Sequence, residues 1–339
     1  MIAKMVSPND PSPLVDHFGR VHNSLRISVI DRCNLRCSYC MPDGPLEFLP
    51  THQLLSFDQI ELLTRVLVKV GVTKIRLTGG EPLLRPGLEQ LVRRLSAIEG
   101  IDDLAMTTNG VLLDRYAARL REAGLQRVNI SLDTLDEAVF ERITRRSGLE
   151  RVLQGIDAAL VAGFEQVRLN ALAIRGLTET EIVPLAEFAI SRGLHLRFIE
   201  YMPLDADHRW RQEQVLTGEE ILRRLETRFG QLIPVSRADP SQPAEDYRFA
   251  NSGNLIGIIR PVTQPFCDSC NRLRLTAEGT LRNCLFSIDE WNLRQHLMEG
   301  REATLLELIR ECVSAKRPGH LISQSEFEQP PRAMYQIGG

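Results

Sequence analysis

Short apolar segments alternate with longer amphipathic segments through roughly the first 200 residues of the chain. The short segments are rich in Val, Ile and Leu, which is typical of strands that are buried on both faces. The longer segments repeat apolar residues every three or four positions, as amphipathic helices do. The pattern predicts strands over 25–30, 74–78, 104–107, 128–132, 167–173 and 196–201, and helices over 57–70, 88–98, 112–123, 149–162 and 181–192.

The ends of the predicted helices are marked by residues that begin or stop a helix. Ser56 and Gln59 predict a capping box at the start of helix 57–70. A glycine follows four of the five helices, where a left-handed residue commonly ends a helix. These glycines are Gly71, Gly124, Gly163 and Gly193.

Six strand–helix units in about 200 residues are two fewer than a complete TIM barrel requires. We therefore expect an α/β fold, a partial (β/α)6 TIM-like barrel whose active site lies at the carboxyl ends of its strands. A doubly wound open sheet is the alternative topology. The expected domains are an N-terminal arm over 1–24, the barrel over 25–202, and a smaller C-terminal region over 203–339 that covers the open side. Short strand-like segments at 232–235 and 255–259 belong to this last region.

The composition of the 339-residue chain, 43% hydrophobic and 25% charged, is that of an ordinary globular protein. Its net charge of −3 gives no basic field for nucleic acid. No apolar run approaches the ~20 residues of a membrane span, and the N-terminus lacks the apolar core of a signal peptide. We therefore expect a cytoplasmic protein that binds neither nucleic acid nor membranes.

The seven cysteines fall into two groups of three and one single residue. This grouping is typical of metal sites and not of a disulfide framework. Free thiols and oxygen-sensitive clusters fit the reducing cytosol, which agrees with the expected location.

The first group is Cys33, Cys37 and Cys40, with the spacing C-x3-C-x2-C. Three thiolates this close together can bind three irons of a [4Fe–4S] cube, so that the fourth iron stays open to a small molecule. A structural zinc site with a distant fourth ligand, or three unconnected thiols, is the alternative. With Tyr39 before the third cysteine, the loop resembles that of the radical S-adenosylmethionine (radical SAM) enzymes. The resemblance implies that SAM chelates the open iron and is cleaved by one electron from the cluster.

A second motif, Thr78-Gly79-Gly80-Glu81-Pro82, follows about 40 residues after the cysteine loop. Two glycines at a strand end let a ligand approach the backbone closely, although alone they indicate only a loop. The position matches the motif that binds the SAM amino group in radical SAM enzymes. The same resemblance implies a set of SAM-binding residues, each of which alone would be taken for a packed aromatic, a strand-end residue or a core Met: Tyr39, Gly80, Ser131 and Met202.

The second group of cysteines is Cys267, Cys270 and Cys284, with the spacing C-x2-C-x13-C. Again there are three cysteines without an obvious fourth ligand. Structural zinc completed by His296 or His320 is the alternative. Cys312 is a further candidate for a fourth ligand, but a lone cysteine in a helical pattern is more often part of the core.

Together these motifs resemble the GTP 3′,8-cyclases, the MoaA family of molybdenum cofactor biosynthesis, along nearly the whole chain. The specific points are Arg26 with the first cysteine loop, the segments 74–82, 107–110, 196–202 and 266–274, and the Gly338-Gly339 end. The resemblance implies that Cys267, Cys270 and Cys284 hold a second [4Fe–4S] cluster, whose open iron binds the guanine of GTP.

The resemblance also implies a set of residues that bind and process the substrate. The substrate-binding residues are Arg26, Lys74, Arg76, Thr107, Arg168, Arg197, Arg272, Leu273 and Arg274, and the catalytic residues are Arg272, Arg274, Gly338 and Gly339. A cluster of buried cations is costly without an anion, and arginine suits phosphate oxygens. Arg168 is a departure, because the family usually has Lys there; the charge is kept, but the side chain is longer and forked.

The implied reaction takes a hydrogen from ribose C3′ of GTP and joins C3′ to guanine C8. Its product is 3′,8-cyclo-7,8-dihydro-GTP, in the first step of molybdopterin biosynthesis. The implied partners are GTP, an electron donor and the next enzyme of that pathway, and a homodimer is an open alternative. Two other functions remain at this point: a radical SAM maturase with an auxiliary cluster, and a non-enzymatic protein with two zinc sites.

Overall fold

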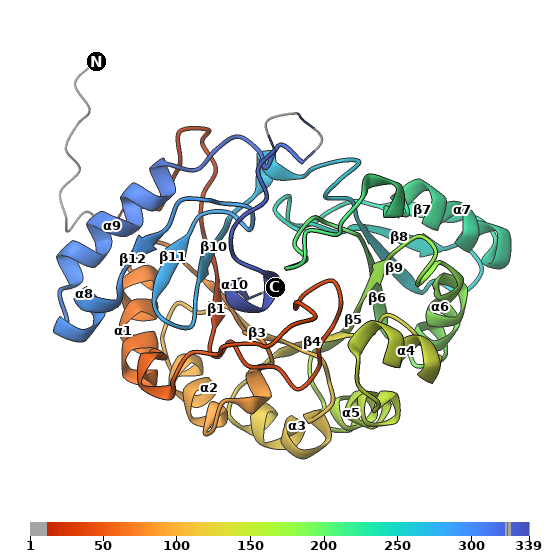
Figure 1. Ribbon diagram of the computed structural model, residues 1–339, viewed down its shortest axis with the longest axis horizontal. Helices are drawn as coiled ribbons and strands as arrows, with labels where there is room; N and C mark the ends of the chain where they lie inside the picture. The colour runs from red at the N-terminus through yellow and green to blue at the C-terminus, as the bar shows by residue number, and fades with distance from the viewer. Residues whose placement is uncertain (1–11, 323, 325–326, 339) are drawn as a thin grey trace.

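The computed structural model describes residues 12–322, 324 and 327–338. Its centre is a 12-stranded sheet in which strands β1 to β6 are parallel and stand side by side in chain order. Figure 1 shows these strands in a curve with the helices outside. Their bounds are β1 Ser24–Ser28, β2 Lys74–Thr78, β3 Asp103–Thr108, β4 Arg127–Ser131, β5 Gln166–Ala173 and β6 His195–Glu200.

The sequential strand order confirms the partial (β/α)6 barrel. In a doubly wound sheet the order reverses at a switch point, and no reversal occurs between β1 and β6. The doubly wound alternative is therefore wrong. All six strands begin and end within two residues of their predicted bounds, because each is a short apolar run with polar residues or glycine at both ends.

The outer layer consists of helices that bury one apolar face each against the sheet. In the first of them the buried residues include Ile60, Leu63 and Leu67, and the predicted capping box of Ser56 and Gln59 is present. The five predicted helices are confirmed within two residues at each end, and α4 was not predicted. The bounds are α1 Phe57–Val68, α2 Leu88–Ser96, α3 Leu113–Glu122, α4 Glu137–Thr144, α5 Leu149–Val161 and α6 Ile182–Ser191.

The C-terminal part of the chain extends the sheet at both edges. Strand β10 pairs in parallel with β1, and β9 pairs in parallel with β6. The predicted strands 232–235 and 255–259 coincide with β7 and β9. The remaining strands are β7 Leu232–Val235, β8 Glu245–Phe249, β9 Leu255–Ile259, β10 Arg272–Leu275, β11 Thr280–Arg282 and β12 Trp291–Asn292.

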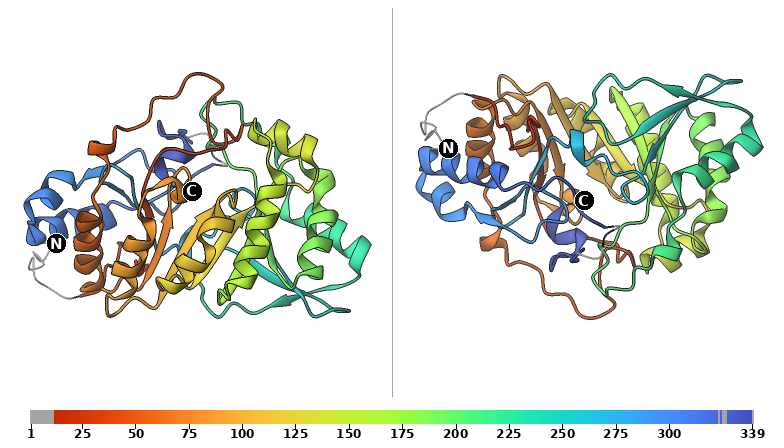
Figure 2. Two further views of the ribbon diagram at one scale, coloured as in Figure 1. Left: turned by 90° about the horizontal axis from the view of Figure 1, so that it is seen from below. Right: turned by 90° about the horizontal axis from the view of Figure 1, so that it is seen from above.

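The C-terminal helices pack at the two edges and in the middle of the fold. Helices α8 and α9 contact α1, and α7 contacts α6. Helix α10 lies at the centre of the curve of strands, as Figures 1 and 2 show. The bounds are α7 Gly218–Phe229, α8 Arg294–Glu299, α9 Glu302–Ser314 and α10 Met334–Ile337, with short 3-10 helices at η1 Thr51–Gln53, η2 Pro82–Leu84, η3 Glu179–Glu181, η4 Gln212–Gln214 and η5 Cys267–Ser269.

One apolar core runs between the sheet and the outer helices along the whole barrel. It includes the outward-facing side chains Leu25 and Ile27 of β1 and Ile75 and Leu77 of β2, each at most 1% exposed. Their neighbours in sequence, such as Arg26 and Arg76, point to the opposite face of the sheet, because side chains alternate along a strand. Within the described residues, no helix combines the length and the apolar character that crossing a membrane requires.

The close packing of α5 against the turn after β3 gives a test of the fold. A Cβ atom at Gly155 would lie 2.3 Å from the carbonyl oxygen of Gly110 and 3.2 Å from Cβ of Leu113. Since backbone cannot move aside easily, we expect Gly155→Ala to destabilise the protein by ~1–3 kcal/mol, despite the higher helix propensity of Ala. Gly44→Ala, whose Cβ would meet nothing within 4 Å, is the control. Calorimetric melting measures both, and equal melting temperatures would contradict the packing.

Candidate functional site

A cavity of about 540 Å³ occupies the inside of the barrel. It is lined by residues from β1 to β6, from the first cysteine loop, from β10 and from α10. The cavity thus brings together nearly all of the residues that the sequence singled out. Those that line it are Arg26, Cys33, Cys37, Tyr39, Cys40, Lys74, Arg76, Gly80, Thr107, Ser131, Arg168, Arg197, Met202, Arg272 and Arg274.

The first cysteine loop follows the carboxyl end of β1 and is held by α4, the helix that was not predicted. The backbone N–H groups of Arg36 and Ser38 donate to the carbonyls of Thr144 (2.8 Å) and Ile143 (2.9 Å), at the end of that helix. Inside the loop, the N–H of Cys40 donates to the carbonyl of Cys37 at 2.9 Å. The loop therefore has a fixed shape in which all three thiols border the cavity.

Glycine is required where the end of β2 meets the start of this loop. The N–H of Gly80 donates to the carbonyl of Ile30 at 2.7 Å. A Cβ at Gly80 would lie 2.3 Å from the carbonyl oxygen of Arg32, which is closer than any real contact. Gly80 thus lets two strand ends touch and leaves its backbone at the cavity.

Glu81 links the ends of β2 and β3. Its carboxylate accepts hydrogen bonds from the hydroxyl of Thr108 and the N–H of Asn109, both at 2.7 Å. Burial raises the pKa of Glu81 to about 7, although these hydrogen bonds act to lower it. The amide of Asn109 also donates to the side-chain oxygen of Asn34 at 2.8 Å, so the ends of β1, β2 and β3 form one unit under the first triad.

Tyr39 is hydrogen-bonded and not merely packed. Its hydroxyl donates to Oδ2 of Asp133 at 2.7 Å, and Oδ1 of Asp133 accepts from the N–H of Leu172 at 2.7 Å. Burial raises the pKa of both Tyr39 and Asp133. Sequence reasoning missed Asp133; its position two residues after Ser131, just beyond β4, was the available signal.

Three arginines stand side by side at one level of the barrel. The register pairs Arg26 of β1 with Arg76 of β2 on one side and with Arg274 of β10 on the other. Side chains at one register level of parallel strands point to the same face, and all three line the cavity. Burial, and then the like charges of the neighbours, lower the pKa of Arg76 to about 10 and that of Arg274 to about 9.

Arg168 and Arg197, on β5 and β6, add two further guanidinium groups to the cavity. Nε of Arg168 and both Nε and Nη2 of Arg197 are buried without a hydrogen-bond partner. Among the described residues, neither these two nor the three arginines of the row forms an ion pair with a carboxylate. Buried cations with free donors indicate a site for a molecule with several negative charges.

Lys74 differs from these arginines because its charge is already paired. Its ammonium group forms an ion pair with Asp239, in the loop between β7 and β8. Asp239, Ser241 and Gln242 line the cavity as well. This loop was not predicted to belong to the site.

The second cysteine group lies at the other end of the barrel from the first. Cys267 and Cys270 come before β10, whereas the first loop follows β1, and these two strands are parallel. All three thiols, with Cys284 after β11, line a second cavity of about 80 Å³. The order along the barrel is therefore first triad, arginine row and second triad.

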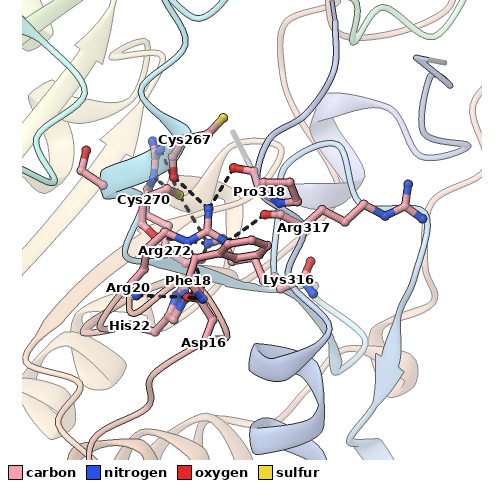
Figure 3. A network of polar contacts seen from close by, with 12 residues as sticks. Asp16, Phe18, Arg20, His22, Cys267, Cys270, Arg272, Lys316, Arg317 and Pro318 are labelled. Atoms are coloured by element: carbon pink, nitrogen blue, oxygen red, sulfur yellow. Dashed lines mark hydrogen bonds and ion pairs between the residues drawn. The ribbon is translucent and has the colours of Figure 1, made fainter. Parts of the chain in front are cut away.

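Cys270 has two cations against its sulfur. Nη2 and Nε of Arg272 lie 3.2 and 3.4 Å from Sγ, and Nζ of Lys316 lies 3.4 Å from it. Burial acts to raise the pKa of Cys270, but these cations outweigh it and lower the pKa to about 5. Figure 3 shows Arg272 and Lys316 beside Cys270.

Some predicted residues lie elsewhere. The Leu273 side chain is fully buried in the core, so only its backbone could meet a ligand. Cys312 is buried on α9, and neither it nor His296 lines the second cavity, whereas His320 does. In the described part of the chain, no three His, Cys, Asp or Glu side chains converge to hold a single metal ion.

The C-terminal tail enters the barrel. The carbonyl of Gly338 accepts a hydrogen bond from Nη1 of Arg274 at 2.6 Å, and Tyr335 packs in one apolar cluster with Met41 and Cys40 of the first cysteine loop. Gly338 has φ 80°, and a Cβ there would lie 2.7 Å from Cγ2 of Thr78. The tail thus lies between the first cysteine loop and the arginine row; the predicted residue Gly339 lies outside the described residues.

Two known sequence families match the chain. The family described as the Radical SAM superfamily matches residues 27–189, and the family described as Molybdenum Cofactor Synthesis C matches residues 194–322. The boundary between the two matches falls near β6, where the barrel passes into the C-terminal region.

Curated relatives match over nearly the whole chain. A GTP 3′,8-cyclase of Rhodopirellula baltica is 54% identical over 334 residues, which cover 97% of this chain and 93% of that protein. A GTP 3′,8-cyclase of Corynebacterium glutamicum (strain ATCC 13032) is 47% identical over 337 residues, covering 96% and 89%. One of Streptomyces coelicolor is 42% identical over 341 residues and covers 100% of both chains.

Solved structures share the fold at low sequence identity. Native anSMEcpe with bound AdoMet has a TM-score of 0.60 at 15% identity, covering 92% of this chain and 94% of that one. Streptococcus suis SuiB bound to S-adenosylmethionine has a TM-score of 0.59 at 15% identity, covering 85% and 68%.

Proposed function

The chain belongs to the GTP 3′,8-cyclase family of radical SAM enzymes, and we propose how its two cysteine triads and its arginines divide the work. The enzyme uses SAM and an iron–sulfur cluster to cyclise GTP in molybdenum cofactor biosynthesis. The single observation that carries the proposal is the row of arginines without carboxylate partners, which lines the barrel cavity between the first cysteine triad and the separate small cavity of the second triad. Such a cavity can hold a nucleoside triphosphate between two metal centres.

Cys33, Cys37 and Cys40 hold the [4Fe–4S] cluster that binds SAM. They fit this role because three free thiols border the cavity on one braced loop, and a cluster needs thiolates on three different irons. Tyr39, Gly80, Ser131 and Met202 surround the SAM at the same end of the barrel. When bound, the cluster and SAM supply a 5′-deoxyadenosyl radical, and the chain's own residues position GTP and exclude water.

Cys267, Cys270 and Cys284 would hold a second [4Fe–4S] cluster, which would supply an open iron for the guanine. The donor set fits, because all three thiols are free and line one cavity. The cations around Cys270 favour the thiolate form that a metal requires. The position of this triad, at the far end from the first, leaves the space between them for the ribose.

The arginines hold the triphosphate and so fix the ribose between the two centres. Arg26, Arg76 and Arg274 line one side of the cavity. Arg168 on β5 and Arg197 on β6 add two further guanidinium groups. Arg168 keeps the positive charge of the usual Lys at the cavity, and its free Nε is a donor for a phosphate oxygen. Lys74, Thr107, Arg272 and the backbone of Leu273 complete the substrate site.

Catalysis also needs the tail and partners outside this chain. Arg272 and Arg274, with Gly338 and Gly339, position the ribose for attack. An electron donor would be needed to reduce the first cluster, and the product would pass to the next enzyme of molybdopterin biosynthesis. The enzyme works in the cytoplasm, where free thiols and clusters survive, without nucleic acid or membrane; a homodimer is compatible with this proposal.

The proposed division of the triads is tested by iron analysis of cysteine variants. Anaerobically reconstituted protein should hold about eight iron and eight sulfide, as two cubes require. Cys284→Ala should lose about half of the iron and keep reductive SAM cleavage without cyclisation, whereas Cys33→Ala should lose SAM cleavage. Cys312→Ala, at the buried seventh cysteine, should keep all of the iron. Equal failure of Cys33→Ala and Cys284→Ala in SAM cleavage would contradict the assignment.

The triphosphate site is tested by binding measurements. Arg76→Ala should weaken GTP binding by ~1.5–3 kcal/mol, the contribution of a charge-assisted hydrogen bond, and leave SAM binding unchanged. Anaerobic calorimetry with each ligand measures both. Arg94→Ala is a matched control, because Arg94 lies on the surface of α2 and pairs with Asp58. Unchanged GTP affinity in Arg76→Ala would make this arginine structural.

The tail is tested by truncation. Deleting Gly338 and Gly339 removes the carbonyl that Arg274 holds but leaves the cysteines and the arginine row in place. We expect cyclisation to fall sharply while folding, iron content, GTP binding and uncoupled SAM cleavage persist, because only the productive alignment is lost. Product analysis for cyclised GTP and for 5′-deoxyadenosine separates the two activities. Full cyclisation by the truncated protein would show that the tail has no catalytic role.

A further inference from the structure

Lys316 is a buried cation that the reaction described above does not use. It follows α9, is 4% exposed, and is one of only four lysines in a chain with 41 lysines and arginines. Its ammonium group donates to the carbonyl of Arg272 (3.1 Å) and to the carbonyl and Sγ of Cys270 (both 3.4 Å). In the part of the chain that the structure describes, no carboxylate pairs with it, so the sulfur of Cys270 is its anionic partner.

The segment that carries Lys316 is fixed to the second cysteine loop by Arg20. The guanidinium group of Arg20 donates to the carbonyls of Cys267 (2.9 Å), Arg317 (2.8 Å) and Pro318 (3.1 Å). It therefore joins the backbone of a cysteine ligand to the backbone next to Lys316. Figure 3 shows these contacts converging on Arg20.

Arg20 is itself held in place from within the N-terminal segment. Its Nε lies 2.5 Å from Oδ2 of Asp16, and the same oxygen is 3.1 Å from Nε2 of His22. All three side chains are almost completely buried. The N-terminal segment thus acts as a rigid clasp, and the ammonium group of Lys316 cannot move away from Cys270 without breaking several buried hydrogen bonds.

We propose that Lys316 raises the reduction potential of the second cluster by holding a fixed positive charge against the sulfur of Cys270. This inference rests on the proposed function, which places a cluster on Cys267, Cys270 and Cys284. A cluster bound by three thiolates carries a net negative charge, and its reduction adds one more. A nearby cation stabilises the reduced form more than the oxidised form, and hydrogen bonds to ligand sulfur act in the same direction.

Lys316 touches no substrate and acts through Cys270, as a positioning residue. Arg272 contacts the same sulfur but also lines the substrate cavity, so its charge would act on both the second cluster and the substrate. Lys316 lines the second cavity and not the cavity that the arginine row lines. Its effect on the potential should therefore be separable from GTP binding.

The experiment compares Lys316→Met with Lys316→Arg in the reconstituted full-length enzyme. Anaerobic redox titrations followed by electron paramagnetic resonance report both clusters, and the second is identified as the signal that Cys284→Ala removes. We expect Lys316→Met to lower the ratio of reduced to oxidised second cluster at least tenfold at one applied potential, which is ~59 mV for one electron. Lys316→Arg should restore most of the ratio, and the first cluster and GTP affinity should stay unchanged.

A surface control and a neutral donor complete the test. Lys69→Met removes a lysine that is 63% exposed and paired with Glu302, and should not shift either potential. Lys316→Gln keeps a hydrogen-bond donor without the charge, so the potential of its second cluster should fall below that of the wild type but less than in Lys316→Met. If both neutral variants keep their full iron content and the potential of the second cluster does not move, the proposed role of Lys316 is wrong, while the proposed function stands. Loss of the second cluster from both variants would have the same meaning, because Lys316 would then be needed to hold the cluster and not to set its potential. A wild-type enzyme with only one cluster would overturn the proposed function, and this inference with it.

Discussion

The parallel pairing of β10 with β1 is the interaction on which the rest of the site depends. It places Arg274 beside Arg26 and extends the arginine row across three strands. Because the two strands run in the same direction, a loop that follows one and a loop that precedes the other must lie at opposite ends of the sheet. The two cysteine triads therefore lie at opposite ends of the barrel, with the arginine-lined cavity between them, as a consequence of strand direction.

The arginine row makes the empty cavity electrostatically unfavourable. Side chains at one register level of neighbouring parallel strands are close together, and these lack carboxylate partners among the described residues. In the proposed function, a bound triphosphate would relieve this repulsion and would accept from the free donors of Arg168 and Arg197, so part of its binding free energy would come from the unfavourable unliganded state. The pairing of Lys74 with Asp239 limits that repulsion at the edge of the row.

The sequence was sufficient for the barrel because each strand is a short apolar run, such as Leu25 to Ile27, between polar ends. It grouped six cysteines into two triads because their spacing is local, and each triad lines one cavity. It missed α4, which has only eight residues, too few for a helical repeat of apolar positions to stand out. It also missed Asp133, Lys316 and Arg20, since their roles depend on contacts with backbone and side chains far away in the chain, and no local pattern records such contacts.

The clasp of Arg20 has a consequence for the order in which the molecule is assembled. Arg20 is 247 residues away from Cys267 and 298 away from Pro318 in the chain, and domains fold largely as the chain emerges from the ribosome. The first cysteine loop finds its supports, β2 and α4, before half of the chain is made. The N-terminal segment, and the edge of β1 that pairs with β10, meet their partners only when almost the whole chain has been made. The two ends of the barrel therefore mature at different times: the loop of the first cysteine triad can form early, whereas the thiols of the second triad come together only when synthesis is nearly complete.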